Sequence, residues 1–272
     1  MSNDKSSIDL TDDLALAHAL ADLADAISLD RYQAQDLVIT TKPDNTPVTD
    51  ADRAVETAIR VALATHRQTD GLVGEEFGSD KGSSGRYWVI DPIDGTKNFM
   101  RGVPTWATLI ALVIGDEVVL SVVSAPAMRQ RWWASREAGA FTRNNSGQQR
   151  LSVSTTPNLI SASLIFSPRS QWAQRQEQFA DLCSRVKTTT ADGDFHLYML
   201  VAQGKADIAC EPELSLWDIA ALIPIVEEAG GTISGFKGES GLVAGCAVAS
   251  NGLLHADTLA AFSPTAPSVP PS

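Results

Sequence analysis

An apolar segment that runs directly into two aspartates is the feature that most constrains the fold of this chain. Residues Tyr87-Trp88-Val89-Ile90 predict a buried β-strand, and the sequence continues as DPIDG. A polar turn would account for aspartate, proline and glycine in this order. A bound cation would account for them as well, because a cation between Asp91 and Asp94 turns the repulsion of two carboxylates into attraction.

Composition limits the class of protein. The chain has 272 residues, of which 44% are apolar, so it can form one large domain or two closely packed ones. Its net charge is −12 and lysines and arginines form no run, which argues against nucleic acid as a partner. The first ten residues contain no hydrophobic signal region, and the apolar stretch Trp106–Ile114 is too short to cross a membrane. Three cysteines without CxxC spacing favour free thiols in a reducing compartment. We therefore expect a soluble cytoplasmic protein that binds neither nucleic acid nor membrane.

Hydrophobic periodicity predicts helices and a hairpin in the first half. One helix is expected from Thr11 to about Leu29, with Thr11 as its N-cap, and a second from residue 50 or 51 to about His66. Two strands, residues 105–114 and 117–124, are expected to pair as a hairpin around a Gly-Asp turn.

The pattern changes after about residue 151. Helices are expected over residues 171–186, 196–203 and 217–229, alternating with short strands, which indicates an α/β arrangement. We therefore expect residues 1–150 to form a mixed α+β half with most of the metal ligands. Residues 151–262 would form an α/β half that closes the substrate site, and the Pro/Ser-rich residues 263–272 a disordered tail.

Acidic residues stand at the ends of apolar segments or at helix starts in four places. Each has a structural explanation when taken alone; Asp218, for example, could simply be a carboxylate favoured at a helix N-terminus. Together they supply six hard oxygen donors, which suit Mg²⁺, while no histidines are paired at HxxxH spacing to favour zinc. The residues are Asp52, Glu75, Glu76, Asp91, Asp94 and Asp218.

The residues after Asp94 predict an anion site beside these carboxylates. Pro92 restricts the backbone, and Gly95 allows close approach of a ligand. A helix that begins at Gly95-Thr96 would point free N–H groups at an anion. Carboxylates that hold metal ions beside such amides are what the hydrolysis of a phosphate ester requires.

The motifs DPIDGTKNF, GEE and WDIAALIPIVEEAGG, in this order, resemble the inositol monophosphatase superfamily of Mg²⁺-dependent phosphatases. The resemblance extends from about Leu14 to Asp257. It implies a layered α/β/α/β/α sandwich, two or three Mg²⁺ ions per site and a homodimer.

The resemblance also implies roles for individual residues. The metal ligands would be Glu75, Asp91, the carbonyl of Ile93, Asp94, Asp52 and Asp218. Glu75 and Thr96, with Asp52 beside them, would activate the attacking water, and the amides of Gly95 and Thr96 would hold the phosphate. Lys42 falls where family members often carry a lysine near the phosphate. Lys97 departs from the threonine that is usual in inositol phosphatases.

Three further stretches, GTKNFMRGVPTWATLIAL, GDFHLYMLVAQGKAD and CEPELSLWD, resemble the histidinol-phosphatase branch of the superfamily. Histidinol carries an ammonium group and an imidazole, so its pocket should offer carboxylates and aromatic surface. Asp194 and Glu211 are acids beyond those needed for metal, and Tyr198 and Trp217 lie nearby in the sequence. The expected substrate-binding residues are Asp94, Gly193, Asp194, Glu211 and Asp218.

Several alternatives remain open from the sequence. Asp194 could be the N-cap of the helix that follows it, Glu211 could be a solvated loop carboxylate, and Cys210 is expected to be a small buried residue. The substrate could instead be inositol phosphate, a sugar bisphosphate or a nucleotide phosphate. A catalytically inactive relative is the third possibility, which the intact carboxylate set and Thr96 disfavour.

Overall fold

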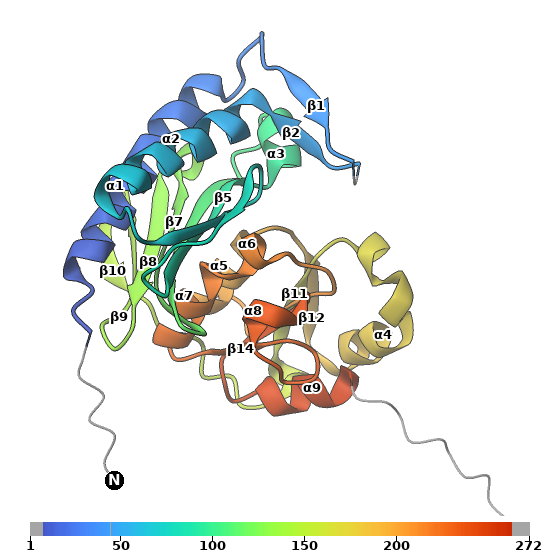
Figure 1. The fold of residues 1–272 in the computed structure, drawn as a ribbon. Helices are drawn as coiled ribbons and strands as arrows, with labels where there is room; N and C mark the ends of the chain where they lie inside the picture. The colour runs from blue at the N-terminus through green and yellow to red at the C-terminus, as the bar shows by residue number, and fades with distance from the viewer. Residues whose placement is uncertain (1–7, 44, 263–272) are drawn as a thin grey trace, which may run out of the picture.

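The computed structural model describes residues 8–43 and 45–262, and its secondary structure is arranged in alternating helical and sheet layers. In Figure 1, helices α1 and α2 cover the outer face of a large sheet, and α5, α6 and α7 lie between this sheet and a smaller one. Helices α4 and α9 cover the far side of the smaller sheet. This order confirms the expected α/β/α/β/α sandwich.

The large sheet has eight strands in the order β10-β9-β8-β7-β6-β5-β3-β4. All neighbouring pairs are antiparallel except β3 with β5, which are parallel. The strands are β3 (Gly71–Gly74), β4 (Gly78–Asp80), β5 (Arg86–Asp94), β6 (Ala107–Ile114), β7 (Glu117–Ala125), β8 (Gln130–Ser135), β9 (Gly139–Asn144) and β10 (Gly147–Arg150). The predicted hairpin is confirmed, because Ile114 pairs with Glu117 across the turn at residues 115–116.

Strand β5, in the interior of this sheet, is buried on both faces and contributes to two separate cores. Trp88 and Ile90 pack towards α1 (Thr11–Arg31) and α2 (Asp50–His66). Val89 points the other way, into the core shared with the middle helices. Successive side chains alternate between the faces of a strand, so an unbroken apolar run can serve two helical layers at once.

The second sheet has five strands in the order β12-β11-β13-β15-β14. Strand β11 is parallel to both β12 and β13, whereas β15 is antiparallel to β13 and β14. The strands are β11 (Ser163–Phe166), β12 (Thr188–Ala191), β13 (Ile208–Glu211), β14 (Thr232–Ser234) and β15 (Ala247–Ser250). A separate two-stranded ribbon is formed by β1 (Ile39–Thr41) and β2 (Pro47–Thr49).

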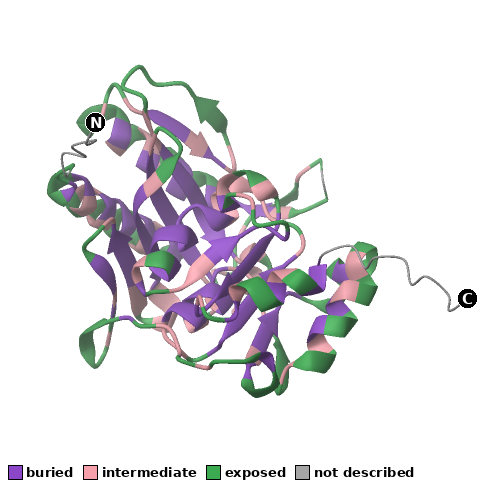
Figure 2. Ribbon diagram, turned by 90° about the horizontal axis from the view of Figure 1, so that it is seen from below, coloured by how far each residue is buried: buried purple, intermediate pink, exposed green. Residues whose placement is uncertain are grey.

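Helices occupy the layer between the eight-stranded and five-stranded sheets and the two outer layers. Figure 2 shows buried residues concentrated in the strands and on the helix faces turned towards them, and exposed residues on the outer helices and loops. The remaining helical elements are α3 (Thr96–Met100), α4 (Gln176–Arg185), α5 (His196–Ala202), α6 (Leu216–Ile219), α7 (Leu222–Glu228), α8 (Gly241–Ala244) and α9 (His255–Phe262). Three 3₁₀ turns are η1 (Pro126–Met128), η2 (Leu159–Ser161) and η3 (Arg169–Arg175).

The N-cap predicted for the first helix is wrong by one residue. The N-cap of α1 is Leu10, whose side chain makes no capping bond. The amide of Thr11 instead donates a hydrogen bond of 3.0 Å to Oδ1 of Asp9. The acceptor that the side chain of a capping residue would supply thus comes from Asp9, the residue before the N-cap.

Two helices predicted in the second half are interrupted. The helix expected over residues 217–229 breaks at residues 220–221 into α6 and α7, because Pro224 has no N–H to bond the carbonyl of Ala220. The helix expected over residues 171–186 begins as the 3₁₀ segment η3 before it becomes α4. There the indole N–H of Trp172 donates to the carbonyl of Ser167 at 3.1 Å and ties the segment to the end of β11.

Other expectations concern the cysteines, the tail and the membrane. All three cysteines are free thiols; Cys210 and Cys246 are buried and Cys183 is partly exposed. Within residues 8–43 and 45–262, no helix has the length and apolar character required to span a bilayer. The tail predicted for residues 263–272 lies outside the described residues, and the division near residue 150 stays a prediction.

Candidate active site

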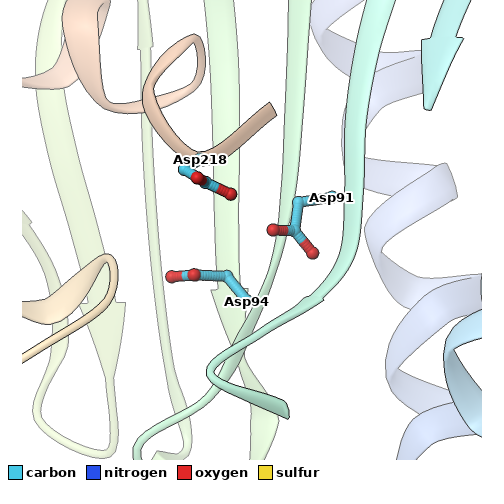
Figure 3. Close-up of side chains that lie close together, drawn as sticks. All are labelled: Asp91, Asp94 and Asp218. Atoms are coloured by element: carbon cyan, nitrogen blue, oxygen red, sulfur yellow. The ribbon is translucent and has the colours of Figure 1, made fainter. Parts of the chain in front are cut away.

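Three aspartates from the two halves of the chain meet at the carboxyl end of β5. Asp91 and Asp94 come from β5 itself, and Asp218 comes from α6 (Figure 3). One carboxylate oxygen of each lies within 4.8 Å of those of the other two. Asp91 is only 2% exposed and Asp94 9% exposed, so these like charges meet away from bulk water.

A β-bulge brings Asp91 and Asp94 to the same side of the strand. Asp91 pairs with Leu109 of β6 and Asp94 with Ala107, so three steps along β5 match two along β6. In a regular strand, residues three apart point to opposite faces, and one extra residue restores them to the same face. Oδ1 of Asp91 also accepts a hydrogen bond of 3.0 Å from the amide of Ile93 within the bulge. The polar turn considered from the sequence is therefore a bulged continuation of the strand.

The electrostatics of this cluster match a site for a hard cation. Burial, and then the nearby Glu75 carboxylate, raise the pKa of Asp91 well above its ordinary value. Burial and the charge of Asp194 do the same to the pKa of Asp94, and burial raises the pKa of Asp218 to about 6. The donors are all carboxylate oxygens, which Mg²⁺ and Ca²⁺ prefer and soft metals do not. A divalent cation would offset both the burial of these carboxylates and the repulsion from neighbouring acids, so the residues fit such an ion.

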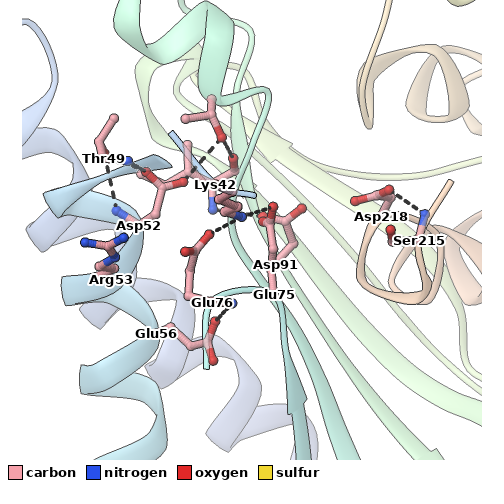
Figure 4. Close-up of polar contacts among 12 residues, drawn as sticks. Lys42, Thr49, Asp52, Arg53, Glu56, Glu75, Glu76, Asp91, Ser215 and Asp218 are labelled. Carbon is pink, nitrogen blue, oxygen red and sulfur yellow. Dashed lines mark hydrogen bonds and ion pairs between the residues drawn. The ribbon is translucent and has the colours of Figure 1, made fainter. Parts of the chain in front are cut away.

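Two of the site acids belong to capping boxes, which fix their orientation (Figure 4). Asp52 accepts hydrogen bonds at Oδ2 from the backbone amide of Thr49 at 2.8 Å and from its hydroxyl at 2.5 Å. Oδ2 of Asp218 accepts from the amide of Ser215 at 2.7 Å. The structural explanation considered for each acid is thus correct, and it leaves one oxygen of each carboxylate uncommitted to the cap.

Thr96 links Asp52 to the bulge. Its Oγ1 lies 3.3 Å from Oδ1 of Asp52 and 3.1 Å from the carbonyl oxygen of Ile93. A hydroxyl has one hydrogen, so it donates to one of these acceptors at a time and keeps lone pairs for another donor. Gly95, just before it, has φ of +85°, and a Cβ there would come within 3.0 Å of the carbonyl oxygen of Thr105. As predicted, a helix, α3, begins at Thr96.

Lys42 lies between the two glutamates that follow β3. Its Nζ is 2.6 Å from Oε1 of Glu75 and 2.6 Å from Oε1 of Glu76 (Figure 4). Burial disfavours the charged amine, but the two glutamates outweigh burial and raise the pKa of Lys42. Glu75 is not part of the group of three aspartates, although its charge acts on Asp91. Its role as a metal ligand stays a prediction.

A buried glutamate from α2 supports the loop that carries Glu75 and Glu76. Glu56 is fully buried, and its two oxygens accept the amides of Glu76 at 2.7 Å and Phe77 at 3.2 Å. Gly74 is required beside it, because a Cβ at that position would lie 2.1 Å from Oε1 of Glu56. The GEE motif therefore depends on a carboxylate about 20 residues earlier that carries no motif signal of its own.

A cavity of about 160 Å³ opens above the aspartate cluster. It contains eight of the eleven site residues expected from the sequence and leaves out Asp52, Gly193 and Glu211. Tyr198 is fully buried, and neither it nor Trp217 lines the cavity, so the predicted aromatic wall is not formed by these two side chains. The lining is Thr46, Pro47, Glu75, Asp91, Ile93, Asp94, Gly95, Thr96, Lys97, Asp194 and Asp218. Larger hollows beside α7 and beside α1 contain none of the cluster.

The alternatives for Asp194 and Glu211 are wrong. Helix α5 begins after Phe195 without a side-chain cap, and Asp194 has φ of +59° and lines the cavity. Glu211 ends β13 and is 5% exposed, so it is not a solvated loop residue. Burial and the charge of Asp194 raise the pKa of Glu211 well above its ordinary value. Tyr198 lies close enough to act on that pKa, yet the pair does not reach hydrogen-bond geometry among the described residues.

Comparisons with known proteins agree with this geometry. A sequence model of the inositol monophosphatase family matches residues 9–265. The chain belongs to the inositol monophosphatase family. Among curated relatives, a histidinol-phosphatase from Mycobacterium tuberculosis is 53% identical over 91% of this chain and 96% of its own length. A histidinol-phosphatase from Streptomyces coelicolor is 52% identical over 92% of this chain and 97% of its own length. Among solved structures, an inositol monophosphatase from Zymomonas mobilis has a TM-score of 0.82 at 31% identity and covers 94% of this chain and 99% of that one.

Some residues that build the site have no role in the expectations drawn from the sequence. Thr49 and Ser215 start S/T-x-x-D patterns, and this capping-box signal could have identified them. Asn98 lies inside the DPIDGTKNF motif, and its Nδ2 donates to Asp194 at 3.2 Å. Glu56 and Asn98 act across the fold, and no local pattern reveals such partners.

Proposed function

We propose that this protein is a Mg²⁺-dependent phosphate monoester hydrolase that acts on L-histidinol phosphate. One observation carries the choice of substrate: Asp194, which is half-buried, lines the same cavity as the cluster of Asp91, Asp94 and Asp218. That acid lies beyond the three-residue cluster, so it is available to a cationic part of the substrate. The identities of 53% and 52% to two histidinol-phosphatases support the same choice.

The residues that would hold the metal ions are Asp91, Asp94 and Asp218, with Glu75, Asp52 and the carbonyl of Ile93 around them. When bound, Mg²⁺ ions neutralise phosphate charge, lower the pKa of a water and stabilise the leaving oxygen. We propose two or three ions for the site, as in the family this chain resembles.

Thr96 and Glu75 would prepare the attacking water. The Thr96 hydroxyl donates to Asp52 or to the carbonyl of Ile93, so a lone pair on Oγ1 remains to accept a hydrogen bond from water and fix its orientation. Glu75 would act as general base and take up the proton that the water loses, which requires it to lie within hydrogen-bond reach of the water. The Nζ of Lys42 lies 2.6 Å from Oε1 of Glu75 and holds its carboxylate in place.

The phosphate and the alcohol would bind in neighbouring parts of the cavity that contains the metal cluster. The amides of Gly95 and Thr96 would hold phosphate oxygens where α3 begins. Asp194, with Glu211 behind it and Gly193 beside it, would face the ammonium and imidazole of histidinol. A neutral polyol such as inositol gains nothing from this concentration of negative charge.

A phosphate-release panel tests the proposal. The purified protein would be assayed with and without Mg²⁺ on histidinol phosphate, inositol 1-phosphate, fructose 1,6-bisphosphate and 3′-phosphoadenosine 5′-phosphate. We expect the highest kcat/KM for histidinol phosphate and no turnover in chelator. A higher value for another ester would reject the substrate, and phosphate release unaffected by chelation would reject the mechanism.

We further propose that the protein is a cytoplasmic homodimer. The three free cysteines are typical of a reducing compartment, and the homodimer follows from the family resemblance. Light scattering coupled to gel filtration would test the oligomeric state.

A further inference from the structure

Asn98 and Asp194 form a polar contact between two segments that lie 96 residues apart. Asn98 belongs to α3, two residues after Thr96, which is proposed to bind phosphate, and Asp194 precedes α5. The Nδ2 atom of Asn98 lies 2.9 Å from the carbonyl oxygen of Thr105 and 3.2 Å from Oδ2 of Asp194. The contact therefore connects the α3 turn to the acid that lines the cavity.

The chemistry of these partners fixes the orientation of the Asn98 amide. An amide nitrogen carries two hydrogens, and here one points to the carbonyl of Thr105 and the other to the carboxylate of Asp194. The flipped amide would place Oδ1 against two acceptors, which is unfavourable. The side chain is consequently held as a donor towards Asp194.

Asp194 needs a donor because its surroundings are acidic. The charges of Asp192 and Lys97 influence Asp194, and the charge of Asp194 influences Asp94 and Glu211. No ion pair between Lys97 and Asp194 is found in the described part of the chain. Asn98 is neutral, so it holds the carboxylate without cancelling its charge. That charge remains available to a cation in the cavity.

The backbone around the contact is shaped to allow it. Asp194 has φ of +59°, a left-handed conformation that aspartate tolerates better than most residues. A Cβ on Gly95 would approach Oδ2 of Asp194 to 3.1 Å, so glycine leaves room for the carboxylate. The next amide, from Phe195, donates to Asp94 at 2.5 Å. One short turn is thus fixed to the α3 region at two points.

From these contacts we propose that Asn98 is a positioning residue for substrate specificity. It holds the Asp194 carboxylate at the edge of the cavity, where the ammonium group of the substrate alcohol meets it. This inference rests on the proposed function, because it assigns the cationic end of histidinol phosphate to Asp194. Asn98 itself does not line the cavity.

A double-mutant cycle on substrate preference tests this role. The unmutated protein, Asn98→Ala, Asp194→Ala and the double variant would be compared by kcat/KM for histidinol phosphate relative to glycerol 2-phosphate, a neutral alcohol ester. We expect Asn98→Ala to lower this ratio about tenfold, chiefly through KM, since a hydrogen bond to a charged group is lost. In the Asp194→Ala background the same change should alter the ratio less than about twofold, because the group it positions is gone. The bond to Thr105 is lost in both proteins that carry Asn98→Ala, and the backbone cost of alanine at residue 194 is present in both that carry Asp194→Ala. Both effects therefore cancel in the cycle.

Two controls accompany the cycle. Arg101→Ala alters an exposed residue at the C-cap of the same helix, outside the cavity lining, and should leave the ratio unchanged. If Asn98→Ala does not fold, Asn98→Leu replaces it, because leucine fills similar space without a donor. An equal loss on both esters, or the same loss in both backgrounds, would overturn the inference and leave Asn98 as a structural support of α3.

A substrate-free measurement separates this inference from the proposed function. Urea unfolding of the four metal-free proteins should give coupling between the two sites of about tenfold in the unfolding equilibrium constant. If the unmutated protein prefers inositol 1-phosphate, the proposed function fails, while coupling in urea would sustain the positioning of Asp194 by Asn98. Additive unfolding effects would overturn that positioning whatever the substrate.

Discussion

Oδ2 of Asp94 accepts a hydrogen bond of 2.5 Å from the backbone amide of Phe195, 101 residues later in the chain. The same aspartate belongs to the cluster with Asp91 and Asp218. One oxygen of Asp94 is thereby committed to the turn that carries Asp194. A change at Asp94 should consequently affect the metal cluster and the substrate-binding turn in different ways.

Replacing Asp94 with asparagine should abolish activity without destabilising the metal-free protein. The amide oxygen of asparagine can still accept the Phe195 amide, and the cluster loses one of its mutually repelling charges. Stabilisation by Mg²⁺ should shrink, because a ligand raises stability only through its affinity for the native state. Thermal unfolding with and without Mg²⁺, together with phosphate release, measures both effects.

Asp181→Asn is a suitable control for that variant. Asp181 lies on α4, far from the cluster in sequence, and forms a partly exposed pair with Arg185 at 3.4 Å. Such pairs contribute little to stability, so neither activity nor the response to Mg²⁺ should change. A strongly lowered melting temperature for metal-free Asp94→Asn, with turnover retained, would contradict the assignment of Asp94 to the metal cluster.

Thr96→Ala should lower kcat far more than it raises KM. Only the hydroxyl contacts Asp52 and Ile93, and the backbone amide proposed to hold phosphate remains. Loss of a group that orients a proton transfer typically costs about 10²- to 10⁴-fold in rate. Steady-state kinetics on histidinol phosphate would show this, and Thr96→Ser, which keeps the hydroxyl, should recover most of the rate. A raised KM at unchanged kcat would mean that Thr96 only binds substrate.

Much of the fold could be predicted from patterns that act locally. The apolar runs of β5 and β6 face cores on both sides. The hairpin of β6 with β7 and the helix α2 could be identified from the strand pattern and from helical spacing. The resemblance to the family then supplied the layer order. What failed were details in which a single side chain decides, such as Asp9 capping α1 and Pro224 dividing α6 from α7.

The site was less predictable because its geometry depends on long-range contacts. The bulge that aligns Asp91 with Asp94 exists only relative to β6, so the sequence of β5 alone suggested a turn. Glu56 lies under Gly74, and this contact follows from the packing of α2 against the sheet. Asp194 was identified as an acid beyond those required for metal, but its donor Asn98 could not be paired with it across 96 residues.

His255 should make the protein less stable as the pH falls below neutrality. Burial lowers the pKa of His255 below the usual 6.5, and its ring nitrogens lie 2.8 Å from Oγ of Ser234 and 3.2 Å from Oγ of Ser250. A proton therefore binds the unfolded chain before the folded one as pH falls. The stabilising contribution of neutral His255 is present above the unfolded pKa and is lost as pH drops from there towards the folded pKa.

Urea unfolding of metal-free protein across this pH range would measure the effect. The difference in unfolding free energy between the unmutated protein and His255→Gln should shift against the unmutated protein as pH falls from about 7.5 to about 5.5. His66→Gln, at an exposed position at the end of α2, provides the matched histidine replacement. A difference that stayed constant with pH for His255→Gln would show that His255 does not titrate differently in the two states.

Glu211→Gln should penalise histidinol phosphate selectively. Glu211 is 5% exposed and interacts electrostatically with Asp94, Asp194 and Asp218, so its carboxyl group influences the cavity although its side chain is not part of the lining. Removing one partner of a desolvated charge pair typically costs about 2–5 kcal/mol. Glycerol 2-phosphate, whose alcohol is neutral, should lose far less, because its phosphate and the metal ligands are untouched. The comparison uses kcat/KM, since specificity is a difference in transition-state binding.

Glu213→Gln, an exposed change two residues later, should leave the hydrolysis of both esters unaffected. Equal losses on the two esters in Glu211→Gln would mean that Glu211 supports the site as a whole and does not select a cationic substrate.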